Sequence, residues 1–141
     1  MKVGYFLMAE GIAQDADGAF SVIRLNQNIV HSAELPVVTK RALVLNLEDE
    51  GEATEGQSLT VSMQVKSPTG AVISAQSQQV TLGAKRYKDL PGAIFVPAEV
   101  VLSLPEYGEY EVIASVTGLD GPPVEGHLAL WCMSGLDPTT P

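Results

Sequence analysis

The chain has 141 residues, which corresponds to about one domain, so two independent cores are excluded. Apolar residues make up 45% of it and charged residues 18%, which is too hydrophobic and too sparsely charged for a disordered chain. Seventeen acidic residues stand against eight basic ones, and the net charge of −9 has the wrong sign for neutralising phosphates. Nucleic acid is therefore not an expected partner.

The sequence does not predict a targeting signal, a membrane span or a reactive cysteine. The apolar run at 3–9 is short and is followed by Glu10, so it does not predict a signal peptide. No run approaches the roughly 20 apolar residues of a membrane span, so we expect a cytoplasmic protein without membrane contact. Cys132 is the only cysteine and has apolar neighbours, which predicts a packed thiol rather than a reactive one.

In chain order, the first predicted elements are two strands joined by a turn. An apolar run at 3–9 and an extended run at 20–25 flank the turn-forming sequence Asp-Ala-Asp-Gly at 15–18. A third strand is expected at 40–48.

The segment 58–80 gives the clearest pattern and predicts a hairpin. Apolar side chains at 59, 61, 63 and 65 alternate with polar ones, which places them on one face of a strand. Pro68-Thr69-Gly70 supplies the turn. We expect Leu59, Val61, Met63 and Val65 to be buried on one face. Their neighbours, or residues of the facing sheet, should include Val22, Leu43, Leu45, Val112, Leu128 and Leu130.

The remaining strands are expected at 94–104, 109–117 and 124–133, with only a weak cue for a helical turn near 97–100. About eight short strands separated by Gly and Pro predict an all-β fold, a single antiparallel β-sandwich that is immunoglobulin-like or related. Residues 1–133 would form the sandwich domain, and 134–141 a loosely attached C-terminal tail.

The segment 74–79 has no charge, no proline and little apolar side chain, so a central core position is excluded. We expect an edge strand there, near or within a protein contact, because unpaired backbone groups at an unguarded edge pair with other chains.

Reactive motifs are absent from the sequence. His31 and His127 are the only histidines, and neither lies in a catalytic or metal-binding motif. No catalytic residue, cofactor-binding residue or metal ligand is predicted, and no cofactor is expected.

Each charged segment has more than one interpretation. The run 48–55 carries five of the acidic residues; we expect a solvated loop, with a cation site as the alternative. Asp15 and Asp17 are expected to shape a turn rather than bind calcium. The segment 85–88 carries three basic residues and predicts a solvated loop, an anion-binding corner, or a partner for the acidic run.

Several turns and strand starts together carry a resemblance. They are Ala9-Glu10 after the first apolar run, 15–23, Ser67-Pro68-Thr69-Gly70, and 104–112. Over roughly residues 2–132 the chain resembles a family of short bacterial single-domain proteins that carry a domain of unknown function, which implies a β-sandwich and implies no catalytic residue.

The sequence Gly108-x-Tyr110 is also similar to the start of a late strand in immunoglobulin-like domains. In those domains a tyrosine hydrogen-bonds back to upstream backbone, and Tyr107 or Tyr110 could take that role here.

The leading functional hypothesis is a non-enzymatic protein that acts through protein contacts or self-assembly. The segments 5–8, 43–45 and 128–133 are apolar at consecutive positions, so both faces of these strands need cover, by a loop, the tail or another chain. The residues predicted for an interface are Met8, Trp131, Ser74, Gln76 and Gln78.

The alternative is a domain whose loops bind a cation or small ligand or, with less support, carry out hydrolysis. Asp15, Asp17 and the acids of 48–55 are its candidate residues.

Overall fold

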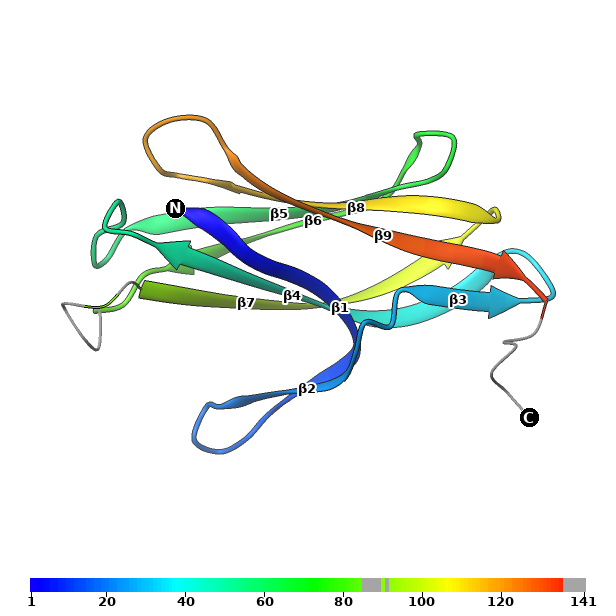
Figure 1. Ribbon diagram of the computed structural model, residues 1–141, viewed down its shortest axis with the longest axis horizontal. Coiled ribbons are helices and arrows are strands. Elements are labelled where there is room, and N and C mark those ends of the chain that lie inside the picture. Colours follow the sequence, from blue (N-terminus) through cyan, green and yellow to red (C-terminus); the bar gives the residue numbers. More distant parts are fainter. Residues whose placement is uncertain (85–89, 91, 136–141) are drawn as a thin grey trace.

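The computed structural model describes residues 1–84, 90 and 92–135, and this part of the chain is all β (Figure 1). The predicted tail after Gly135 and the basic segment 85–88 lie outside the described residues. No helix that could cross a membrane occurs in the described part. The nine strands are β1 (Lys2–Gln14), β2 (Phe20–Leu25), β3 (Ile29–Ser32), β4 (Val37–Asp49), β5 (Ser58–Lys66), β6 (Val72–Thr81), β7 (Gly92–Leu104), β8 (Gly108–Thr117) and β9 (Val124–Ser134).

The strands form two sheets, which we call sheet A and sheet B. Sheet A has the order β2-β1-β4-β7, and sheet B, which is curled, has the order β3-β9-β8-β5-β6. The all-β prediction is confirmed, with nine strands among the described residues instead of about eight. The expectation of a purely antiparallel arrangement is wrong, because β3 runs parallel to β9.

A helical turn near 97–100 was also a wrong expectation, because β7 runs through these residues. Pro97 fits there because β7 is an edge strand, where a missing N–H costs no ladder hydrogen bond. The carbonyl of Pro97 accepts a hydrogen bond from Nε2 of Gln78 at 3.4 Å, on the side away from β4.

The core lies between the two sheets, as the alternation in β5 predicts. Leu59, Val61, Met63 and Val65 are each at most 3% exposed. Most of their predicted neighbours join the same cluster: Leu43, Leu45, Val112 and Leu130 are buried, and Leu128 packs against them. Val22 lies outside this cluster, on β2 of the facing sheet A.

Met8 belongs to this core as well. It lies on β1 opposite Leu43 and is 2% exposed, so its side chain points between the sheets. The expectation that Met8 faces outward into an interface is therefore wrong. Of two apolar neighbours in a strand, the sequence alone does not say which one points inward.

The outer face of sheet A is covered in part by the chain itself. Val44 points away from the core, since Leu43 and Leu45 point into it, yet it is only 1% exposed. The rings of Phe20 on β2 and Phe95 on β7 lie 5.1 Å apart, although β1 and β4 separate these strands in the sheet. Strands are spaced about 4.8 Å apart, so the β1–β2 hairpin must fold over the outer face, as Figure 1 shows below the sandwich.

A tyrosine fixes the corner between β7 and β8. The hydroxyl of Tyr110, which is fully buried, donates to the carbonyl of Glu106 at 2.7 Å and accepts from its N–H at 3.0 Å. Gly108 in this corner has φ of +128°, and a Cβ there would lie 3.0 Å from Pro68. Of the two tyrosines considered, Tyr110 takes the corner role; Tyr107 instead donates to the carbonyl of Ser32.

Tyr110→Phe should lower the free energy of unfolding by about 1–3 kcal/mol, because both backbone groups of Glu106 lose their partner. Urea denaturation measures this. Tyr107→Phe is the matched control: its hydroxyl makes one hydrogen bond at the surface, so the expected loss is below about 1 kcal/mol. Equal losses in the two variants would contradict the corner's role.

Cys132 should react with a thiol reagent only after unfolding. Its side chain is fully buried, and this burial raises the pKa of the thiol, so little thiolate is available to react. We expect labelling by Ellman's reagent to follow the unfolding transition in urea. Stoichiometric labelling within seconds in native buffer would show that the thiol is accessible.

Candidate functional site

A polar hollow lies on the outer face of sheet B, and we call it the sheet B hollow. Strand register brings its lining together: Gln64, Ile113 and His127 lie side by side on β5, β8 and β9. Ser62, Ser115 and Glu125 form the next row, and Ser77 of β6 lies beside Ser62. The hollow has a volume of about 720 Å³. A neighbouring hollow of about 560 Å³ shares Lys66, Glu111 and His127 with it.

Carboxylates on both sides hold the imidazole of His127. Its Nδ1 lies 3.1 Å from Oε1 of Glu111, and its Nε2 lies 3.3 Å from Oε2 of Glu125. Both ring nitrogens thus have a carboxylate partner, and no serine hydroxyl is among their hydrogen-bond partners in the described residues. The ring is also half exposed, at 51%, so it lies in water rather than in a desolvated site.

The second histidine does not join this arrangement. His31 is in register with Met133 on β9, six residues further along that strand than His127. At about 3.3 Å per residue the two rings are too far apart to share a metal ion or a substrate. The Nδ1 of His31 is buried without a hydrogen-bond partner in the described structure.

An apolar patch lies on the same outer face, next to the smaller hollow. Ile29 of β3 is in register with Trp131 of β9, and the two side chains are 51% and 39% exposed. Met133, two residues on, is 44% exposed. Trp131 lies opposite Glu109, which lines the smaller hollow. The structure thus places the predicted interface residue Trp131 at the surface.

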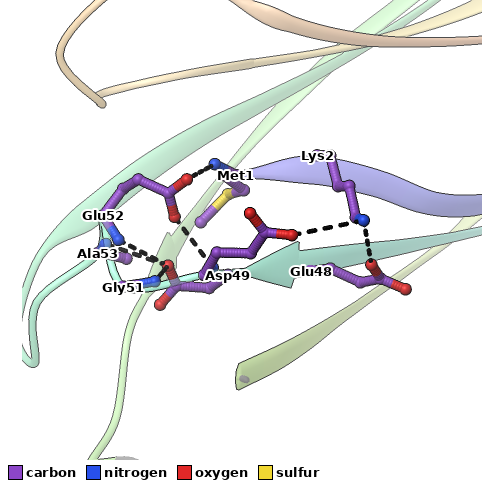
Figure 2. A network of polar contacts seen from close by, with 8 residues as sticks. Met1, Lys2, Glu48, Asp49, Gly51, Glu52 and Ala53 are labelled. Atoms are coloured by element: carbon purple, nitrogen blue, oxygen red, sulfur yellow. Dashed lines mark hydrogen bonds and ion pairs between the residues drawn. The ribbon is translucent and has the colours of Figure 1, made fainter. Parts of the chain in front are cut away.

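The acidic run 48–55 is organised by hydrogen bonds within the chain (Figure 2). Oδ1 of Asp49, which is buried, accepts from the N–H groups of Gly51, Glu52 and Ala53 at 2.9–3.2 Å. This carboxylate therefore shapes the loop after β4.

Cationic groups of the chain pair with three of the other acids of this run. Lys2 lies 3.3 Å from Glu48 and 3.4 Å from Glu50, and these carboxylates raise its pKa. The amino group of Met1 pairs with Glu52 and lowers the pKa of that carboxyl.

The predicted turn at 15–18 has the structure that its residues favour. Oδ1 of Asp15 accepts from the N–H groups of Asp17 and Ala19 at 2.9 and 3.0 Å. Within residues 1–84, 90 and 92–135, no three His, Cys, Asp or Glu side chains are placed to hold a metal ion. The acids named for a cation site are thus not gathered into one.

The prediction of an edge strand at 74–79 is confirmed. These residues belong to β6, which pairs with β5 and ends sheet B. Gln76 and Gln78 are exposed, and Ser74 is half-buried. The ten residues of β6 include no charged residue and no proline.

The sequence did not predict the sheet B hollow. Its lining comes from four strands, and their adjacency depends on the order β9-β8-β5-β6. The one available signal was the polar half of the β5 alternation, Ser62 and Gln64, which by itself indicates only the solvent side of a strand.

Comparisons with known proteins give the fold and no family. No family model matches the chain, and no curated protein matches it. A solved structure of a proposed beta-galactosidase from Bacteroides fragilis has 15% sequence identity and a TM-score of 0.53 over 87% of this chain, which spans only 16% of that protein. The C-terminal domain of Wzt has 8% identity and a TM-score of 0.54, covering 96% of this chain and 75% of that domain.

Asp49→Ala should destabilise the protein by about 2–3 kcal/mol, because three backbone N–H groups lose a charged acceptor. Glu55→Ala, an exposed acid of the same loop, is the control and should change stability by less than about 0.5 kcal/mol. Thermal unfolding measures the stability of both variants, and repeating it with millimolar calcium tests whether the loop binds the ion. A rise in Tm with calcium that Asp49→Ala abolishes would reinstate the cation site.

Proposed function

We propose that the protein is a non-enzymatic, immunoglobulin-like β-sandwich that works through protein contacts, and that two copies pair at their β6 edges. The observation that carries this proposal is the unguarded β6 edge. The chain has a single cysteine, Cys132, which is buried and free, and this suits a reducing compartment. Together with the family resemblance, it supports a bacterial, cytoplasmic protein.

The edge strands β6 and β7 differ in how they are protected against pairing with another chain. β7 carries Pro97 and the exposed Glu99. The Pro97 carbonyl also accepts a hydrogen bond from the side chain of Gln78 on β6. Proline and charge are the usual means by which edges avoid pairing with other chains. β6 has neither of them, and its exposed residues are glutamine, serine, alanine, valine and threonine.

The composition of β6 also suits pairing with a second copy. Opposite residues of an antiparallel pair point to the same face, so a two-fold axis at Gln76 sets each Gln76 against its symmetry mate. The same register sets Ser74 opposite Gln78 of the second copy. No like charges meet along this seam, although the whole chain carries a net charge of −9.

Gln76→Lys should weaken self-association by about 1–4 kcal/mol, because it places two like charges opposite each other at the two-fold axis. Light scattering after size-exclusion chromatography measures the oligomer at micromolar concentration. Val101→Lys, which adds the same charge at an exposed position of β7, is the matched control and should leave the dimer intact.

A charge swap separates this contact from misfolding. Gln76→Lys and Gln76→Glu should each be monomeric, and an equimolar mixture should form the dimer again. In the wild-type dimer, the outward amides of 74–79 should also be protected from hydrogen exchange. A wild-type chain that is monomeric at micromolar concentration would overturn the proposal, and dissociation by Val101→Lys alone would move the contact to sheet A.

A further inference from the structure

We propose that the sheet B hollow binds an uncharged oligosaccharide, with Gln64, Ser62 and Ser115 as hydrogen-bonding residues and Trp131 as an apolar platform beside it. This site lies on a sheet face and needs only one copy of the chain. It therefore does not require pairing at β6, although Ala75, Gln76 and Ser77 of that strand line its border.

The hydrogen-bonding side chains of the hollow are available to a ligand. Ser62, Gln64, Ser77 and Ser115 line it, and none of them forms a side-chain hydrogen bond with another described residue. The amide of Gln64 offers donors and an acceptor, and each serine hydroxyl offers both. A surface with mixed donors and acceptors, fixed on rigid strands, fits a ligand that carries many hydroxyl groups.

The ionic groups of the hollow are largely committed to one another. His127 contacts Glu111 and Glu125 on its two sides, and Lys66 lies opposite Glu111 in the strand register. One lysine against these acids cannot hold a phosphate backbone. The described residues also hold no three-residue metal cluster, so neither an anionic polymer nor a metal-bridged ligand fits.

The position on a sheet face disfavours a peptide. Most of the hollow lies over β9, β8 and β5, which pair with neighbours on both sides, so their backbone groups are used within the sheet, and only its border reaches the edge strand β6. Extended peptides bind by adding a strand to a free edge, where backbone donors and acceptors remain unpaired. Over these strands, a ligand must be recognised by side chains.

Size and an exposed aromatic ring complete the argument. About 720 Å³ is within the range of small-ligand sites, and the adjoining hollow of about 560 Å³ extends it toward Trp131. A sugar ring has one face of C–H groups and a rim of hydroxyls. An indole that is apolar on its face and stands beside hydrogen-bonding side chains matches both parts.

The test is a printed array of uncharged and charged oligosaccharides probed with the fluorescently labelled full chain, followed by titration of the best binder in ¹H–¹⁵N spectra. We expect an uncharged glycan to bind and to shift the amides of 62–64, 113–115 and 127–131. Gln64→Leu should weaken binding about three- to tenfold, and Trp131→Ala about tenfold or more.

Val101→Ala, an exposed change on the outer face of sheet A, is the matched control and should leave binding unchanged. A cooperative thermal unfolding transition for each variant shows that it is folded. If Trp131→Ala does not fold, Trp131→Leu takes its place. Absence of any uncharged ligand on the array would overturn the proposal. So would binding that is unaffected by Gln64→Leu, or binding of charged glycans or of peptides only.

Discussion

Strand β4, one of the two inner strands of sheet A, has buried apolar side chains on both of its faces. The rest of the fold depends on this burial on both sides. Leu43 and Leu45 require a second sheet on one side, while Val44 between them requires cover on the other. Sheet B meets the first need and the β1–β2 hairpin, folded over sheet A, meets the second.

Local patterns in the sequence were enough for most of the strands. The alternation at 59–65 predicted both the strand and the face that is buried, because a period of two has one solution in a half-buried strand. The run at 43–45 likewise predicted that both faces need cover. Which element supplies that cover could not be predicted, since the contact between Phe20 and Phe95 joins residues 75 positions apart. The prediction that Met8 faces outward was wrong for a related reason, because a run of consecutive apolar residues does not show which of them point into the core.

The candidate site depended on information that the sequence does not display. Gln64, Ser115 and His127 come from three strands, and only the strand order makes them neighbours. Their polar character is ordinary for solvent-facing positions, so no motif distinguishes them. By contrast, the edge position of 74–79 could be predicted, because its uncharged polar composition excludes a buried strand whatever its neighbours are. Local composition can exclude a position in the fold, while a shared surface requires the topology.

For copies that pair through β6 as proposed, the contrast between β6 and β7 limits how large the assembly can grow. Two edges that could both pair would let copies add one after another into an open fibre. Here the proline in β7 interrupts one edge, and the other sheet B edge, β3, is only four residues long. A contact made through β6 uses the same surface on both partners and leaves no equivalent surface free. The position of one proline thus favours a closed pair over a polymer, even though the neighbouring edge has neither proline nor charge.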